Sequence, residues 1–391
     1  MEDRRWIILL VLFIARTSLA FQVQSVTSIS TFLINDLQLG LSEIGTLVGL
    51  IMLPGIFIAL PSGFIGHWYS GKQFVLTGLI LMVLGGFVST VADSYAWMVV
   101  ARIISGIGVV LNIVYMAKMT TDWFAGKEIA TAMSVLVTSW PLGFALGQVF
   151  QPEMAAHWGW RVVPLSTSII CLACAALIWQ AYREPDSTGG AETPTQVRNL
   201  SLKSVVLVSL SGLIWMALNV GYLIYLSFTP TILMEGGENI VVANQITSVG
   251  SWVMFLSIPM FGWLADRTRR PDLLLFAGTL MAIASLALLP GTQYPELLCL
   301  VFGLLGVAPA GIVMSLPAQV LAPNERAIAM GIFYTFYYAG MTLGPSIAGT
   351  LADYYTSSNA AMYFAAALFL VLALCHFAFR VIQLTLPKEA L

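Results

Sequence analysis

Charge is the property that this sequence lacks most. Only 9% of its 391 residues are charged, against about 25% in a soluble domain, while 59% are apolar. So little polar surface cannot cover several apolar cores in water, which excludes an ordinary soluble enzyme of this length. A membrane-spanning helix takes about 20 apolar residues. Twelve such helices and short loops account for the chain, so the sequence predicts a polytopic membrane protein with almost nothing outside the lipid bilayer.

Patterns typical of catalysis, cofactors and nucleic acid are also missing. The three histidines are far apart, and there is no P-loop or dinucleotide fingerprint. All four cysteines lie in apolar runs, and the C-x-x-C pair Cys171 and Cys174 lacks the βαβ pattern of redox proteins. A net charge of −2 without a basic block argues against a nucleic-acid partner. We therefore expect no enzyme activity, no cofactor and no metal site.

Twelve apolar segments alternate with short polar breaks. The segments cover about 6–34, 44–65, 74–92, 96–117, 129–151, 161–181, 204–234, 240–264, 273–290, 296–321, 327–351 and 360–382. The longest break, rich in Thr, Ser, Gly, Pro and charge, divides them six plus six. We expect an all-α membrane protein with an N-terminal six-helix bundle over 1–182, a cytoplasmic linker over 183–203 and a C-terminal six-helix bundle over 204–391.

Lysine and arginine set the expected orientation. With a cytoplasmic N-terminus and twelve alternating helices, all 17 basic residues except Arg16, Arg102 and Arg161 fall on the cytoplasmic side. Arg161 falls at an external helix end, and the other two lie inside the membrane zone. This bias predicts a multi-pass protein of the cell inner (plasma) membrane with both termini in the cytoplasm. We also expect a monomer.

Two stretches near helix ends carry a recognisable motif. The break after segment eight, 262–270, reads Gly-Trp-Leu-Ala-Asp-Arg-Thr-Arg-Arg and resembles the signature loop of the major facilitator superfamily. The first-half counterpart, 63–72, is degenerate, with His67 in place of the aspartate. Within the segments, Arg102-x-x-x-Gly106 resembles the superfamily's segment-four motif. Gly340-x-x-x-Gly344-Pro345 resembles its segment-five motif, which segment five keeps in weaker form over 140–147.

This resemblance spans the whole chain and implies the major facilitator fold, in which two six-helix bundles rock about a central site. It also implies conformational roles. Charges of the signature loop can form ion pairs in one state and hydrate in the other, and glycines permit close helix approach. The alternatives are orientation and plain packing, and for Arg102 a structural contact near Asp93. The expected gating residues are Arg102, Gly106, Pro141, Gly143, Asp266, Arg267, Arg270, Gly344 and Pro345.

Arg16 is the strongest candidate for substrate binding. It lies about ten residues into segment one, roughly 15 Å deep at helical rise, where insertion costs at least about 2.5–3.5 kcal/mol. No Asp or Glu lies deep in any segment, so a substrate anion is the expected counterion of Arg16. The alternative is pairing with backbone carbonyls or with Gln22 and Asn112.

Polar side chains in segments one, four and seven are the other expected substrate contacts. With Arg16 they form the predicted set of substrate-binding residues Gln22, Asn112, Tyr115, Asn219 and Tyr222. For each, the alternative is helix–helix hydrogen bonding. Arg16 is similar to a segment-one arginine of anion-carrying branches of the superfamily, and the chain most resembles the cyanate-permease-like branch. The resemblance thus implies a secondary transporter for a small, anionic solute by symport or antiport.

Two other functions stay open. The Met- and aromatic-rich interior also fits an exporter of apolar drugs or metabolites, although such antiporters usually need a membrane carboxylate. A non-transporting membrane sensor or scaffold on the same fold is the second alternative, and saturable counterflow of any substrate would remove it.

Overall fold

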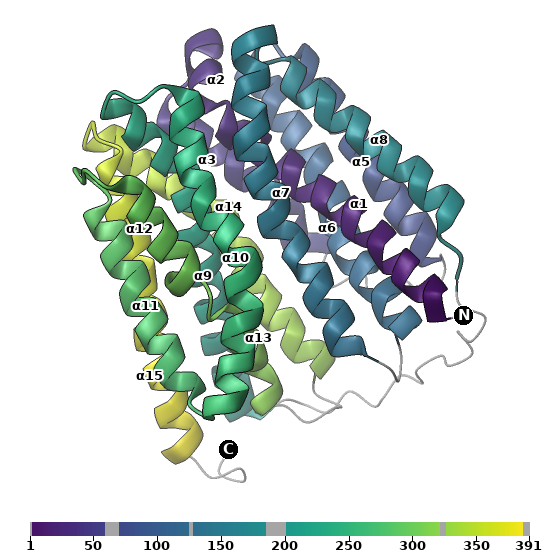
Figure 1. The fold of residues 1–391 in the computed structure, drawn as a ribbon, viewed down its shortest axis with the longest axis vertical. Helices are drawn as coiled ribbons and strands as arrows, with labels where there is room; N and C mark the ends of the chain where they lie inside the picture. Colours follow the sequence, from purple (N-terminus) through teal and green to yellow (C-terminus); the bar gives the residue numbers. More distant parts are fainter. Residues whose placement is uncertain (1, 59–69, 125–127, 185–200, 321–325, 386–391) are drawn as a thin grey trace.

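The computed structural model describes residues 2–58, 70–124, 128–184, 201–320 and 326–385, and all regular elements in these ranges are helices. Most of them run side by side through the molecule (Figure 1). Both chain ends lie toward one face, which we call the terminal face, and the opposite face is the far face. The loop 63–69 with His67, and most of the linker 183–203, lie outside the described residues.

The first half of the chain supplies six passes through the membrane region, which we call crossings. They are α1 (Glu2–Ser28), continued by α2 (Ser30–Leu37), then α3 (Leu41–Leu50), α5 (Gly71–Val91), α6 (Tyr95–Phe124), α7 (Ile129–Trp158) and α8 (Val162–Ala181). Within this half α1 packs on α7 and α8, and α5 packs on α6 and α8.

The second half supplies six more. They are α9 (Leu202–Glu235), α10 (Ile240–Thr268), α11 (Pro271–Leu288), a broken crossing of α12 (Pro295–Val301), η1 (Phe302–Gly306), α13 (Ala310–Ser315) and η2 (Pro317–Gln319), then α14 (Arg326–Tyr354) and α15 (Asn359–Thr385). The broken crossing was expected as one segment over 296–321. Pro309 and Pro317 lie at its breaks, because proline lacks the N–H that a continuous helix needs.

Ten described helices are long and apolar enough to cross a membrane. The two further crossings, α7 and α14, have 30 and 29 residues. At 1.5 Å per residue these lengths exceed the roughly 30 Å of a bilayer core. The predicted all-α, twelve-helix polytopic fold is confirmed.

Glycines bring the two halves into close contact on the far face, where α3 packs on α14 and α7 packs on α10. A Cβ atom on Gly45 would overlap the Pro345 carbonyl, and one on Gly49 would overlap that of Thr342. From the other side, a Cβ on Gly349 would overlap the Leu41 carbonyl. No larger residue fits these positions without moving a backbone, so the glycines set how closely the halves approach.

Hydrogen bonds reinforce this contact. The Asp353 carboxylate accepts from the backbone N–H of Ser42 at 2.7 Å and of Leu41 at 3.1 Å. It thereby caps α3, where the positive end of the helix dipole favours an anion. The Ser42 hydroxyl lies 3.0 Å from that of Thr350, and Thr46 lies 2.8 Å from Ser346.

Polar contacts on the terminal face, in contrast, stay within one half. Arg5 pairs with Glu128 at 2.7 Å, and Lys72 donates to the carbonyls of Trp179 and Tyr182. Among the described residues, every hydrogen bond between the halves lies toward the far face. Over the described ranges, hydrogen bonds therefore tie the halves together on the far face and not on the terminal face.

Arg161, the basic residue expected at the external end, lies on the far face. Asp36 of α2 accepts hydrogen bonds from Trp160 Nε1 at 2.9 Å and from Arg161 at 3.0 Å. These contacts, the Trp160 hydrogen bond first, lower the pKa of Asp36. The contact fastens α2 to the start of α8 within the N-terminal half.

Replacing Gly45 with valine should separate α3 from α14. Overpacking of this kind costs about 1–3 kcal/mol. We expect a disulfide between Ser42→Cys and Thr350→Cys to form more slowly in the Gly45→Val background, measured as thiols lost to maleimide labelling. Gly262→Val is the control, since a Cβ there meets nothing within 4 Å. Equal rates in both backgrounds would contradict the packing account.

Candidate functional site

Arg16 lies in the middle of the first membrane span, twelve residues from each of its ends, Arg4 and Ser28. The residue is only 8% exposed. Its Nε and NH1 atoms are buried and have no hydrogen-bond partner in this structure. The backbone carbonyls, Gln22 and Asn112, considered as partners from sequence, do not satisfy these two atoms.

Three tyrosines of the opposite half interact electrostatically with this guanidinium. Tyr334, Tyr337 and Tyr338 of α14 all lie within electrostatic range of Arg16. They share one face of the helix at i, i+3 and i+4, and their rings touch, with centroids 5.0 Å apart for Tyr337 and Tyr338. Each hydroxyl can donate a hydrogen bond, so the site combines a fixed positive charge with donors from both halves.

Carboxylates do not neutralise this charge. Among the described residues, no Asp or Glu forms an ion pair with Arg16. A buried charge is normally paired, because the membrane interior does not solvate it. The site is therefore chemically complementary to an anion.

Arg102 is bonded differently. Only 2% exposed, it donates from Nε to the Leu47 carbonyl at 2.9 Å and from NH2 to the Val23 carbonyl at 3.2 Å. These bonds join α6 to α3 and α1 inside the N-terminal half. They favour the structural alternative for Arg102, with backbone carbonyls as partners instead of Asp93.

The other expected substrate residues of the N-terminal half make contacts inside that half. Gln22 donates to the Met82 carbonyl of α5 at 2.8 Å and accepts from Cys171 of α8. Asn112 donates to the carbonyl of Gly108 in its own helix. Tyr115 stacks on Phe74 of α5, with ring centroids 4.0 Å apart. None of the contacts described for these three side chains is to Arg16, and these contacts fit helix packing.

Asn219 and Tyr222 lie on α9. Asn219 is half-buried and donates to the Trp215 carbonyl one turn earlier. The Tyr222 hydroxyl lies 2.8 Å from that of Ser251, and its ring meets Phe144 of α7 edge-on at 5.9 Å. Tyr222 thus contacts the opposite half, as expected of a residue between the bundles.

The glycines and prolines expected to govern conformation lie at helix contacts. A Cβ on Gly143 would overlap α1 at Thr17 and Ala20, next to Arg16, and one on Gly106 would overlap the Ile51 carbonyl. In the second half Gly344 packs on Val220, while Pro345 faces Gly45 across the halves. Pro141 lies buried inside α7.

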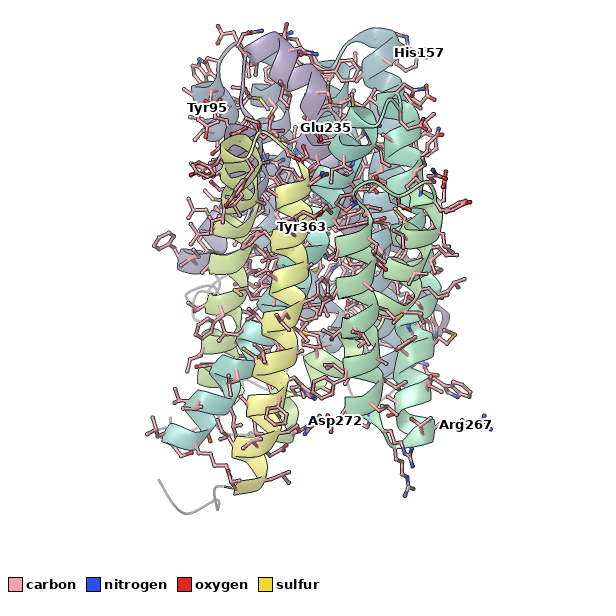
Figure 2. The ribbon with its side chains drawn as sticks, turned by 90° about the vertical axis from the view of Figure 1, so that its left-hand side faces the viewer. Tyr95, His157, Glu235, Arg267, Asp272 and Tyr363 are labelled. Carbon is pink, nitrogen blue, oxygen red and sulfur yellow. The ribbon has the colours of Figure 1, made fainter. Side chains whose placement is uncertain are left out.

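The charged residues of the signature loop, 262–270, face the surface in this structure. Asp266, Arg267 and Arg270 are exposed, and no ion pair joins them among the described residues. Arg267 lies over the Trp263 ring at 5.1 Å. Figure 2 shows Arg267 and Asp272 at the terminal face, and His157 and Glu235 toward the other end. The ion-paired state of the loop remains a prediction.

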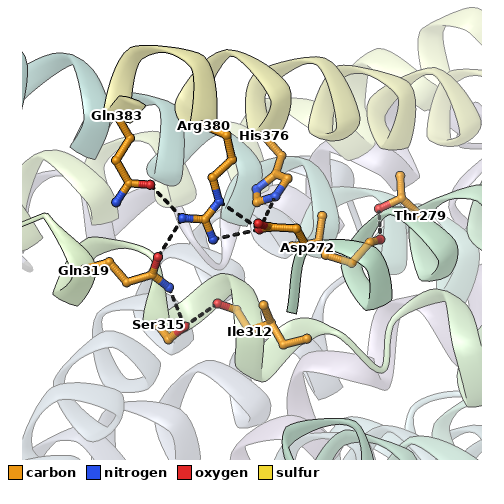
Figure 3. A network of polar contacts seen from close by, with 9 residues as sticks. Asp272, Thr279, Ile312, Ser315, Gln319, His376, Arg380 and Gln383 are labelled. Atoms are coloured by element: carbon orange, nitrogen blue, oxygen red, sulfur yellow. Dashed lines mark hydrogen bonds and ion pairs between the residues drawn. The ribbon is translucent and has the colours of Figure 1, made fainter. Parts of the chain in front are cut away.

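A nearby acid forms a network that the sequence did not reveal (Figure 3). Asp272, at the start of α11, accepts from His376 at 2.9 Å and from Arg380 Nε at 2.8 Å, both on α15. Arg380 also donates to Gln319 of η2 at 2.9 Å. The i, i+4 spacing of His376 and Arg380 was the available signal, but nothing in sequence placed Asp272 opposite them. The network ties three crossings together at the terminal face.

Removing the donors of Arg102 should destabilise the N-terminal half. Hydrogen bonds to charged groups contribute about 1.5–3 kcal/mol each. We expect Arg102→Met to lower the thermal midpoint of the purified protein by several degrees and Arg102→Lys to lower it less. The exposed Arg267→Met is the control, and an unchanged midpoint in Arg102→Met would refute the structural role.

A family model supports the fold independently. The model of the Major Facilitator Superfamily matches residues 8–243 and again 237–390. An uncharacterized protein of Campylobacter jejuni is 29% identical over 135 residues, which cover 34% of this chain and 42% of that protein. The resemblance to a cyanate-permease-like branch stays a prediction.

Longer matches connect the chain to two named bacterial proteins. The 3-(3-hydroxy-phenyl)propionate transporter of Escherichia coli is 22% identical, covering 82% of this chain and 79% of its own. The membrane sensor protein UhpC of Salmonella typhimurium is 23% identical, covering 77% and 75%.

Solved structures share the whole architecture. A bacterial homolog of the human lysosomal transporter Spinster, in an inward-facing and occupied conformation, superposes with a TM-score of 0.76 at 16% identity, covering 100% of this chain and 99% of that one. The nucleoside transporter NupG gives 0.73 at 17% identity, covering 97% and 100%. At these identities the likeness concerns the fold. With the family match over nearly the whole chain, it leads to one conclusion: this chain belongs to the major facilitator superfamily and is a multi-pass membrane protein of the secondary-transporter type, not an enzyme.

Proposed function

We propose that this protein carries a small anion across the membrane by alternating access and that Arg16 binds the anion. The observation that supports this most is the buried guanidinium with two unpartnered nitrogens in the middle of α1. Its charge costs at least about 2.5–3.5 kcal/mol at the membrane centre. A bound anion offsets that cost, and no described carboxylate does.

The position of the tyrosines supports alternating access. Arg16 belongs to the N-terminal half, whereas Tyr334, Tyr337 and Tyr338 belong to α14 of the C-terminal half. An anion between them contacts both halves at once. Its affinity then depends on how the halves are arranged, which is the condition for a ligand to shift a conformational equilibrium.

The relatives fit an organic anion. Propionates and hexuronates are carboxylates at neutral pH, and both appear in the names of relatives: the Escherichia coli protein above and the hexuronate transporter of Bacillus subtilis, 20% identical over 66% of this chain. We propose a carboxylate as the charged group of the substrate.

The positive-inside rule gives the orientation we propose. The terminal face carries Arg5, Lys72 and Arg267, so we assign it to the cytoplasm of a bacterial inner membrane. The hydrogen bonds between the halves lie on the far face among the described residues, which supports a state whose centre opens toward the cytoplasm.

A sensor is the second candidate, favoured by the likeness to the Salmonella typhimurium membrane sensor. A sensor on this fold would also bind an anion at Arg16, so binding alone does not separate the two functions. Counterflow in proteoliposomes does, since a transporter exchanges labelled for unlabelled anion and a sensor does not.

Arg16 is tested by ligand-induced stabilisation. A ligand at 100 times its Kd stabilises the folded protein by about 2.7 kcal/mol. We expect at least one carboxylate from a panel to raise the thermal midpoint of the wild type, to have no effect on Arg16→Ala, and to have a reduced effect on Arg16→Lys, which keeps the charge but not the fork of donors.

Arg161→Ala is the matched control, because it removes an arginine that is paired with Asp36 on the far face. It should keep the full ligand response. Stabilisation of Arg16→Ala equal to that of the wild type, by any anion that binds the protein, would show that Arg16 is structural. Stabilisation by apolar or cationic compounds alone would favour the exporter alternative.

A further inference from the structure

Three buried glutamines lie together between α1 and α7. Gln24, Gln148 and Gln151 are 1%, 0% and 0% exposed. We call these three residues the amide cluster. None of them belongs to the site around Arg16 described above.

Contacts around Gly147 bring Gln24 and Gln151 together, and Gln148 lies on the same helix as Gln151. A Cβ atom on Gly147 would lie 2.9 Å from Gln24 Cβ and Cγ and 3.4 Å from Gln151 Nε2. Gln148 follows Gly147 in the chain and shares a face of α7 with Gln151 at i, i+3. Gln148 also follows Phe144 by one turn, and the Phe144 ring meets Tyr222 of the C-terminal half. The cluster therefore lies beside the boundary between the halves.

Most polar atoms of the cluster have no partner. Both amide atoms of Gln24, both of Gln148, and Oε1 of Gln151 are buried without a hydrogen bond. Only Gln151 Nε2 is used, donating to the Phe21 carbonyl at 2.7 Å. Gln22, on the same helix α1, has both amide atoms engaged. Because buried polar groups in native proteins are nearly always paired, these five atoms need hydrogen-bond partners from outside the protein, either water or a polar ligand.

The cluster lies at a fixed distance from the charged site. Gln24 follows Arg16 by eight residues on α1, which is about 12 Å along the axis toward the far face. Between the two levels, Thr17 and Ala20 press against Gly143, so α1 and α7 hold this spacing rigidly. The side chains of Arg16 and Gln24 are both long, so a ligand shorter than about 12 Å can contact the polar ends of both.

We infer that the amide cluster is a second subsite, which binds the hydroxyl or carbonyl groups of an organic anion whose carboxylate is held by Arg16. The inference rests on the proposed function and narrows it. An amide offers both a donor and an acceptor without charge, so it matches hydroxyl groups and does not match a second charge. A small inorganic anion occupies only the Arg16 site and leaves the amides unpaired. The substrate class is thus a hydroxylated organic acid.

Pairs of ligands that differ in hydroxyl groups test this inference. The probes are 3-(3-hydroxyphenyl)propionate against 3-phenylpropionate, and glucuronate against cyclohexanecarboxylate, with Kd values from thermal shift titrations of the full-length protein. In the wild type we expect the hydroxylated member of at least one pair to bind about tenfold tighter, the value of one hydrogen bond. In Gln24→Leu and Gln148→Leu that preference should fall to about one, while the Kd of the deoxygenated member stays within twofold.

Ser139→Ala is the control on α7, because the Ser139 hydroxyl bonds only to the Leu136 carbonyl of its own helix. It should keep the wild-type preference. If the Gln148→Leu variant does not fold, Gln148→Met replaces it at nearly equal volume, and the same loss of preference is expected.

The outcomes separate this inference from the proposed function. If carboxylates bind through Arg16 but both members of each pair bind equally, the subsite is wrong and the anion site stands. A preference that survives both leucine variants overturns the subsite as well. If no anion binds, or binding survives Arg16→Ala, the proposed function fails and the subsite with it.

Discussion

An unpaired positive charge in the middle of the membrane is the constraint on which the rest of this structure depends. Lipid does not solvate the Arg16 guanidinium, and the described part of the protein supplies neither a carboxylate nor a hydrogen bond to its Nε and NH1 atoms. Three tyrosines of the other half of the molecule lie within electrostatic range of it. In the function proposed here, an anion offsets the energetic cost of this buried charge, and that cost becomes selectivity for the charge of the ligand.

Under the proposed function, close packing on one face decides which face admits the ligand. Gly45, Gly49 and Gly349 let the backbones of α3 and α14 meet on the far face, and Asp353 caps α3 from the opposite half. On the terminal face the polar contacts stay within each half, as the Asp272 network illustrates. Two rigid halves that touch at one end can exchange that contact for one at the other end without unfolding either half, because the hydrogen bonds that hold each half together do not cross between them.

The sequence predicts the fold well because hydrophobicity and length leave few alternatives to twelve helices, and because Arg16 stands out as a charge in an apolar run. It predicts the site less completely, since periodicity does not show which way a helix faces. Gln22, Asn112 and Tyr115 were expected near Arg16, but the contacts described for them are to Met82, Gly108 and Phe74. Gln148 and Gln151 were overlooked, because two glutamines in an apolar helix carry no motif, and only the packing of Gly147 against Gln24 reveals them.

The central claim is that one anion contacts Arg16 and the tyrosines of α14 together. A double-mutant cycle tests it most directly, with the Kd of the most stabilising carboxylate measured for wild type, Arg16→Lys, Tyr337→Phe and the double variant. Groups that bind one ligand jointly show coupling of about 0.5–3 kcal/mol. We predict coupling in this range, a several-fold departure from the product of the single effects. Additive effects would contradict the claim, because they would mean that Arg16 and Tyr337 do not act on the same anion.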